Sequence, residues 1–333
     1  MLFRASLLAL LITGCTGTVG DVPGGAGGGG GDPTGGGAGG GGTIPLRLST
    51  FQSLNGGLPS NFKPAGAALL NGTIYLGGGS GVFSLDANAT AWADSAAPLN
   101  AGETVTSVTR NGLTVLVTVA DTAGGHGGVL AYDFGPGAWR RTMAPDAPAY
   151  ALLKKSSELV LVAGDSLWAS TDGNSWMKRS SGACVQGAVK FFAGSAAAVR
   201  IFTVTAAGLC FSDDQGASWN TGLIGGDIVA LAAADQYVLI ISTTDGAQRS
   251  ENYGSTFHPF TPTGAVSAFA MTSGKTFAVT PAGLIVSDDG GQTWSDGNAG
   301  LPTGMPIDAL VVAGSDVLAS LGGEVWLAQL SLQ

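Results

Sequence analysis

Charged residues are scarce in this chain, because only 11% of its 333 residues are Asp, Glu, Lys or Arg. The formal net charge is −9, which repels a nucleic acid backbone, so neither DNA nor RNA is an expected partner. There are only two histidines and no Cys-x-x-Cys pair. Such a chain lacks the residues for a histidine-rich or paired-cysteine metal site, and we predict neither a metal nor a cofactor.

The N-terminus has only a short apolar run, from Ala5 to Ile12. It is much shorter than the ~20 residues that a membrane-spanning helix needs. A single basic residue, Arg4, precedes it, which is the arrangement of a signal peptide. We therefore predict that residues 1–14 direct export.

This segment ends in Leu11-Ile12-Thr13-Gly14-Cys15. The pattern resembles the lipobox of bacterial lipoproteins, in which small residues precede a cysteine that is diacylated and becomes the mature N-terminus. The resemblance implies lipidation of Cys15 and attachment to a membrane. Because Thr16 follows the cysteine instead of Asp, it also implies an outer-membrane lipoprotein, on the periplasmic or the cell-surface face. The alternative is an ordinary signal peptide with an incidental cysteine.

Glycine, by contrast, is abundant, with 56 residues, and it dominates positions 20–43. Such a segment buries no apolar area, so residues 15–43 are predicted to be a flexible tether. About 28 residues span a root-mean-square distance of roughly 30 Å, so we expect the folded domain to float above its membrane. Residues 44–333 form that domain.

The folded domain contains a repeated segment that begins with serine and ends with an aromatic residue. Four copies align: Ser212 to Trp219, Ser287 to Trp294, Ser250 to Phe257 and, one residue shorter, Ser170 to Trp176. Looser copies end at Trp92 and Trp139, and successive aromatic residues are 47, 37, 43, 38 and 37 positions apart. A period near 40 is typical of a four-stranded propeller blade, so we predict an all-β fold, a seven-bladed β-propeller of four-stranded blades. Six or eight blades are the alternatives, because the second repeat is irregular.

The chain ends with three predicted strands, 307–312, 317–320 and 325–330, which lack a fourth. Residues 51–59 at the start of the domain resemble residues 294–302, so that Phe51 takes the place of a closing tryptophan. We therefore expect strand Leu46–Phe51 to join the C-terminal blade and close the ring, which removes exposed sheet edges.

Two copies match Ser-x-Asp-x-Gly-x-Thr-Trp and resemble the Asp-box, or BNR, repeat. Asp-box propellers include sialidases, xyloglucanases, the sortilin ectodomain and the photosystem II assembly factor. In this repeat the Asp and Ser side chains hydrogen-bond to backbone groups of the turn, and the tryptophan fills the space between sheets. The resemblance therefore implies structural roles for six residues: Asp172, Trp176, Asp214, Trp219, Asp289 and Trp294.

The resemblance fixes the fold, and not the function. Sialidases need three arginines for the substrate carboxylate, a Tyr–Glu nucleophile pair and an aspartate. None of the seven arginines in the domain stands in the Arg-Ile-Pro context of that family. We therefore favour a non-catalytic, monomeric propeller that binds an envelope protein or polysaccharide. A sialidase-like glycoside hydrolase and an assembly factor for an envelope complex are the alternatives.

Two groups of residues are candidates for binding. Seven of the 14 basic residues fall in the second and third repeats and predict a rim for an anionic partner: Arg110, Arg140, Arg141, Lys154, Lys155, Lys178 and Arg179. The alternative is a rim of solvated charges. The second group, Asp121 and His126, lies in the longest loop between second and third strands, Ala120–Gly128.

Cys184 and Cys210 fall in the fourth repeat. An exported protein meets oxidising conditions, which favours a disulfide between them. Two buried free thiols are the alternative.

Overall fold

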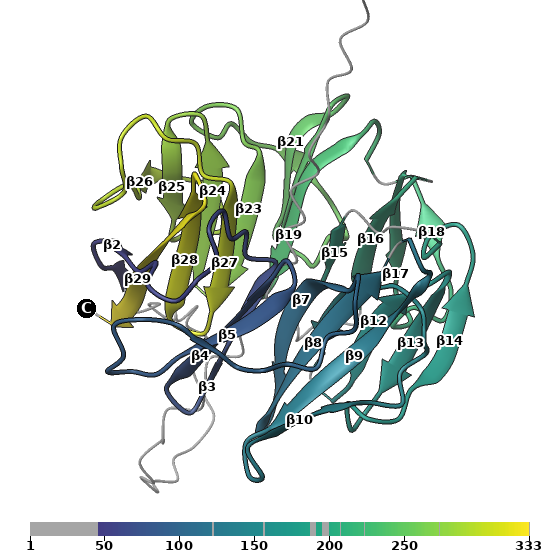
Figure 1. Cartoon of the computed structure of the whole chain (residues 1–333). Coiled ribbons are helices and arrows are strands. Elements are labelled where there is room, and N and C mark those ends of the chain that lie inside the picture. The colour runs from purple at the N-terminus through teal and green to yellow at the C-terminus, as the bar shows by residue number, and fades with distance from the viewer. Residues whose placement is uncertain are drawn as a thin grey trace, which may run out of the picture.

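The computed structural model describes residues 46–121, 123–155, 157–186, 191–194, 200–206, 208–222, 224–272 and 274–332. The predicted signal peptide, Cys15 and the tether lie outside these residues. The described chain is all β, and its sheets form seven antiparallel blades around one axis (Figure 1). The predicted seven-bladed β-propeller is confirmed. The described part contains no helix with the length and apolarity to cross a membrane.

In each blade, the strands are named here in order from the ring axis outward. Blade 1 has β3 (Gly66–Leu70), β4 (Thr73–Gly78), β5 (Gly81–Leu85) and β6 (Ala93–Asp94); blade 2 has β7 (Thr104–Asn111), β8 (Thr114–Asp121), β9 (His126–Asp133) and β10 (Ala138–Arg141). Blade 3 has β11 (Ala149–Lys154), β12 (Leu159–Ala163), β13 (Ser166–Ser170) and β14 (Met177–Ser181); blade 4 has β15 (Phe191–Ala193), β16 (Ile201–Thr205), β17 (Gly208–Ser212) and β18 (Asn220–Thr221). Blade 5 has β19 (Ile228–Ala234), β20 (Tyr237–Ser242), β21 (Gly246–Ser250) and β22 (His258–Pro259); blade 6 has β23 (Ala268–Thr272), β24 (Lys275–Thr280), β25 (Gly283–Ser287) and β26 (Ser295–Asp296). Blade 7 has β27 (Ala309–Ala313), β28 (Asp316–Leu321), β29 (Glu324–Leu332), β1 (Leu46–Leu48) and β2 (Gln52–Ser53).

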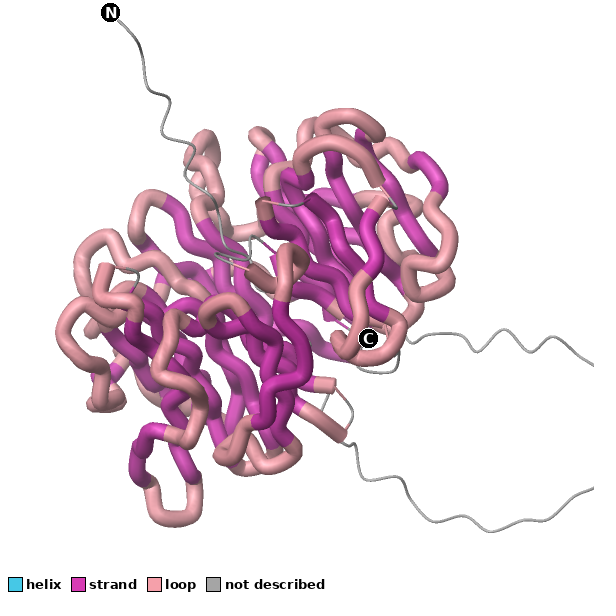
Figure 2. Tube along the Cα trace, turned by 90° about the vertical axis from the view of Figure 1, so that its right-hand side faces the viewer, coloured by secondary structure: helices cyan, strands magenta, loops and turns pink. Residues whose placement is uncertain are grey.

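The antiparallel order gives every blade two ends. The turns between first and second strands and between third and fourth strands lie at one end, which we call the Asp-turn face. The turns between second and third strands and the links to the next blade lie at the other end, the loop face. Figure 2 shows these turns in pink at both ends of the strands.

The hydrophobic core lies between neighbouring blades. Phe202 of blade 4 packs with Ile240 of blade 5, and Phe277 of blade 6 packs with Leu310 of blade 7. All of these side chains are buried, because each sheet has one neighbour on either face. No blade can therefore bury its apolar surface alone.

The N-terminal strand joins the C-terminal blade, as predicted. Leu46 pairs with Leu332 in β1, and Gln52 pairs with Leu327 in β2. The structure corrects one detail, because the expected continuous strand Leu46–Phe51 is interrupted between these two pairings. At the interruption Phe51 N donates to Ala299 O over 2.8 Å instead of to β29.

Phe51 is only 3% exposed and belongs to the core between blades 6 and 7. We predict that Phe51→Ala lowers the free energy of unfolding by about 3–5 kcal/mol, because the substitution leaves a cavity where the ring closes. Urea denaturation followed by tryptophan fluorescence measures the loss. Gln52→Ala, at an exposed position of the same segment, is the control. Equal stability of the two variants contradicts the role of Phe51 in closure.

Candidate functional site

The aspartates of the repeated turns are occupied by the turns themselves. In blade 6 the Ser287 hydroxyl donates to Asp289 Oδ1 over 2.7 Å, and it accepts from Gly291 N over 2.7 Å. Asp289 also accepts the backbone and the hydroxyl of Thr293, at 2.9 and 2.6 Å. This bonding fixes the turn and uses the lone pairs that a catalytic carboxylate needs.

The turns of blades 3, 4 and 5 have the same bonding. Hydrogen bonds from the backbone of Ser175 and Asn174 lower the pKa of Asp172 to about 2. The Ser218 hydroxyl and backbone lower the pKa of Asp214 to about 2. Blade 5 has Asn252 at the equivalent position, where its Oδ1 accepts from Thr256 N over 2.9 Å. A neutral amide therefore makes the same turn.

Each turn also packs against the preceding blade. Gly254 of blade 5 has φ +77°, and a Cβ there would lie 2.3 Å from Cζ of Phe202 in blade 4. Gly216 of blade 4 has φ +90°, and a Cβ would lie 2.0 Å from Cδ2 of Leu167 in blade 3. Glycine is required at these positions both by the backbone angle and by the close approach.

Four arginines bind the turn of the blade that follows their own. Arg140 donates to Asn174 Oδ1 at 2.6 Å, and Arg179 donates to Gln215 O at 3.1 Å. Arg200 donates to Gly254 O at 2.5 Å. The last pair is Arg249 with Gly290 O, at 2.6 Å. These arginines connect successive blades, and each also forms an ion pair with a carboxylate of its own blade.

The rest of the predicted basic rim is also divided among separate contacts. Arg110 donates to Gly112 O at 2.8 Å, and Arg141 pairs with the buried carboxylate of Glu103. Burial lowers the pKa of Lys154, and it lowers that of Lys155 to about 8.

Arg179 also forms a bidentate ion pair with Glu158. Among the seven residues, Lys178 is exposed and has no ion pair in the described contacts. The structure does not bring the seven residues together into one open basic surface.

The predicted loop of blade 2 is shorter than expected, because β8 continues to Asp121 and β9 begins at His126. Asp121 Oδ1 accepts from Ala123 N and Gly124 N at 3.0 and 2.9 Å, which braces the turn. His126 Nδ1 lies 3.0 Å from Asp146 Oδ2 in the link to blade 3. This hydrogen bond lowers the pKa of Asp146. Both side chains are exposed, so they contribute to the loop face.

Three inner strands each carry one bulged residue near the loop face, and its side chain is at least partly accessible. In blades 2, 3 and 5 the pairing with the second strand shifts at Thr106, Tyr150 and Val229. A β-bulge re-aims the side chain of its extra residue. Val229 is 39% exposed on a strand that is otherwise buried. Burial raises the pKa of Tyr150, and the negative charge of Asp165 raises it further. We call these three residues the bulge set.

A cavity of about 260 Å³ opens on the loop face between blades 4 and 5. Its lining includes Val204 and Thr205 from blade 4, and Asp227 and Ile228 from blade 5. The turns and links of this face carry further acidic side chains: Asp121, Asp146, Asp165, Asp245, Asp308 and Glu324. The loop face is therefore acidic, hydroxyl-rich and hollowed at one blade junction.

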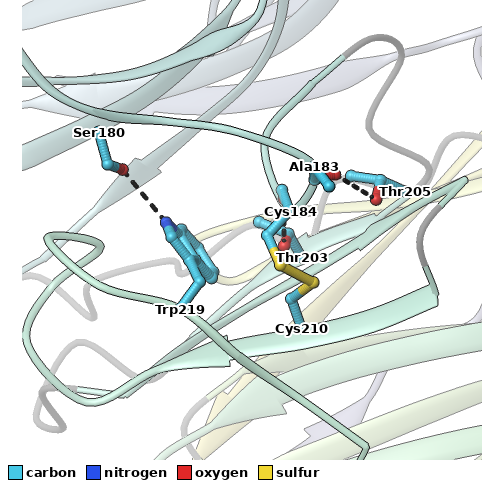
Figure 3. Close-up of a disulfide and its surroundings, with 7 residues drawn as sticks. All are labelled: Ser180, Ala183, Cys184, Thr203, Thr205, Cys210 and Trp219. Carbon is cyan, nitrogen blue, oxygen red and sulfur yellow. Dashed lines mark hydrogen bonds between the residues drawn. A yellow bond between two sulfur atoms is a disulfide. The ribbon is translucent and has the colours of Figure 1, made fainter.

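Cys184 and Cys210 form a disulfide within blade 4 (Figure 3). Cys184 lies in the link that enters the blade, and Cys210 lies on β17. Around the bond, the hydroxyls of Thr203 and Thr205 donate to the carbonyls of Cys184 and Ala183 at 2.6 and 2.9 Å (Figure 3). The entering link is thereby fastened to the second and third strands of the blade.

Within the described ranges, no three His, Cys, Asp or Glu side chains are grouped as metal ligands. Sequence reasoning placed Asp165, Asp245 and Glu324 on the loop face. It missed the bulge set and the cavity, because neither a one-residue shift in pairing nor the packing of two blades leaves a mark in the sequence.

Comparison with known proteins identifies the architecture. No protein-family model and no curated protein sequence matches the chain. A solved structure described as YCF48 bound to D1 peptide is 13% identical, with a TM-score of 0.67 over 87% of this chain and 100% of that one. YCF48 from Cyanidioschyzon merolae is 13% identical, with a TM-score of 0.63 over 84% and 98%. A chain of a mitotic checkpoint complex is 10% identical, with a TM-score of 0.63 over 92% and 99%. At these identities the likeness shows the propeller fold.

The lowered aspartate pKa values predict an acid dependence of stability. Because Asp172 and Asp214 have a folded pKa below that of the unfolded chain, about 3.9, their contribution is complete above pH 4 and is lost as the pH falls toward 2. We expect the double variant Asp172→Asn/Asp214→Asn to lose less stability than wild type over this range, as measured by thermal unfolding. Asp235→Asn, at another turn, is the control. An unchanged slope in the double variant contradicts the prediction.

The disulfide predicts a redox dependence of stability. Cys184 and Cys210 are 26 residues apart, and closing such a loop contributes about 3 kcal/mol. We expect a reducing agent to lower the melting temperature of wild type and to leave a Cys184→Ala/Cys210→Ala variant unchanged, as measured by calorimetry. A reductant that lowers both melting temperatures equally shows that it acts elsewhere.

Proposed function

We propose that this chain is an exported, lipid-anchored, non-catalytic β-propeller that binds a protein or glycan partner at the cell envelope through its loop face. The observation that carries the proposal is the convergence of the bulge set and the cavity on that face. Loops held on a rigid scaffold are where propellers and other folds most often place binding residues. The Asp-turn face, by contrast, uses its polar groups to hold the blades together.

The positions of the arginines argue against the sialidase-like alternative. A carboxylate-binding site needs several guanidinium groups that point into one cavity. Here Arg140, Arg179, Arg200 and Arg249 bind successive turns around the ring. Their geometry supports binding over hydrolysis.

Assembly of an envelope complex is the second candidate. It is favoured by the similarity in fold to YCF48, which one solved structure describes as bound to D1 peptide. A propeller of this architecture thus accommodates a peptide, and we extend that capacity to the loop face of this chain as part of the proposal.

In the first test, intact cells are crosslinked and the captured chain is analysed by mass spectrometry. A loop-face variant carries Asp227→Lys, Val229→Lys and Glu324→Lys, all at exposed positions. A matched control carries Gln52→Lys, Ser181→Lys and Thr221→Lys on outer strands. We expect the loop-face variant to lose the partner and the control to retain it, because three new positive charges disrupt an acidic binding face.

The same three proteins are applied to an array of glycans and to a sialoside hydrolysis assay. Glycan binding that only the loop-face variant loses supports a polysaccharide partner. Undiminished capture by the loop-face variant overturns the proposed binding face. Hydrolysis by wild type supports the enzyme alternative.

A further inference from the structure

The N-terminal segment joins the propeller on the Asp-turn face. Strand β29 begins at Glu324, just after a turn of the loop face, and runs to Leu332 at the opposite end of blade 7. Leu46 pairs with Leu332, so the first described residue lies at the Asp-turn end of the ring. An anchor at Cys15 is therefore connected to this face of the domain.

Exposed apolar side chains gather on two blades of the same ring. Leu113 and Phe134 lie in the turns at the Asp-turn end of blade 2, where they are 60% and 43% exposed. Met143 and Met177 lie at the rim between blades 2 and 3, where they are 72% and 76% exposed. We call these four residues the apolar edge. Lys178, next to Met177, is also exposed.

Backbone contacts bring the residues of the apolar edge together in two pairs, and the side chain of Arg140 lies between the pairs. Phe134 N donates to Leu113 O over 3.1 Å, which places the two turns of blade 2 side by side. Met143 N donates to Asn174 O over 2.9 Å, in the turn of blade 3 that leads to Met177. Arg140 spans the interval between these pairs, because it bonds both Asp133, next to Phe134, and Asn174.

Basic residues are concentrated beside the turns of the Asp-turn face. The described members of this group are Arg47, Arg110, Arg140, Lys154, Lys155, Lys178, Arg179, Arg200, Arg249 and Lys275. On the loop face, the described basic residues are Lys63 and Arg141, and Arg141 is paired with Glu103. The Asp-turn face also carries acidic side chains: Asp86, Asp133, Glu158, Asp172, Asp213, Asp214, Asp235, Glu251, Asp288, Asp289 and Asp316. Both faces are therefore acidic, but carboxylates outnumber basic groups by more on the loop face, so an anionic surface approaches the loop face less readily than the Asp-turn face.

We propose that the Asp-turn face is the membrane-proximal face, and that the apolar edge and Lys178 touch the headgroup region of an anionic phospholipid bilayer. This inference rests on the lipid anchor of the proposed function. A tether with a root-mean-square reach of roughly 30 Å keeps the effective concentration of the domain at the bilayer high. A weak contact is then enough to orient the domain, in place of the free floating that the tether alone predicts. In this orientation the loop face points away from the membrane, toward a partner.

The test uses the full, lipidated chain reconstituted in vesicles of phosphatidylethanolamine and phosphatidylglycerol. Hydroxyl-radical footprinting with mass spectrometry then measures the oxidation of each methionine. The reference sample is the same chain in buffer without vesicles or detergent, after proteolysis in the tether has removed its anchor. Relative to this sample, we expect the oxidation of Met143 and Met177 to fall several-fold. Met305, which is 40% exposed in a loop-face link, is the internal control and keeps its oxidation rate.

A variant with Leu113→Ser and Phe134→Ser keeps both methionines as reporters, and both substitutions are at exposed positions. We expect the variant to lose most of the protection of Met143 and Met177. Protection of Met305 alone, or equal oxidation of all three methionines with and without vesicles, overturns the inferred orientation. Protection that the variant retains in full overturns the role of the apolar edge.

The N-terminal peptide of the same sample distinguishes this inference from the proposal on which it rests. Acyl chains on Cys15 without protection of Met143 and Met177 overturn the orientation and leave the anchor in place. A Cys15 without acyl chains overturns the lipid anchor, and the inferred orientation fails with it.

Discussion

The ring depends on how closely the turn of one blade packs against the sheet before it. Gly254 leaves no room for a Cβ beside Phe202, and Arg200 reaches from blade 4 to bind the carbonyl of the same glycine. The glycine and the arginine thus each connect two neighbouring blades. Each turn is therefore both the end of one sheet and part of the packing surface of another, which explains why Ser, Asp and Gly occur together in these segments.

This arrangement divides the polar chemistry of the molecule between its two faces. On the Asp-turn face, carboxylates and guanidinium groups satisfy turn backbone and connect blades, as Asp289 and Arg249 do. On the loop face, side chains such as Val229 and Asp227 have no such task and remain accessible. The face whose polar groups mainly connect the blades thus differs from the face that we propose binds a partner, and the orientation inferred for the anchored domain directs the loop face outward.

Much of the fold was predictable because the repeat carries its own spacing. Trp219 and Trp294 mark equivalent positions, and the likeness of the segment after Phe51 to the segment after Trp294 predicted how the ring closes. The break in the first strand was not predictable, because Phe51 N bonds Ala299, a residue far along the chain. The basic rim was proposed from positions in sequence alone, which do not reveal that Arg141 has an acidic partner in the link between blades 1 and 2, and Arg179 one in a turn of blade 3.

The sequence by itself predicted a propeller with seven blades favoured over six or eight, the turn that each aspartate forms and the segment that closes the ring, because these depend on local hydrogen bonding and on a regular period. Only the tertiary structure decided which charges are paired, where the inner strands bulge and which face the N-terminal segment joins. These features arise from contacts between residues far apart in the chain, such as Leu46 with Leu332, and from one-residue shifts in pairing that a sequence pattern does not record.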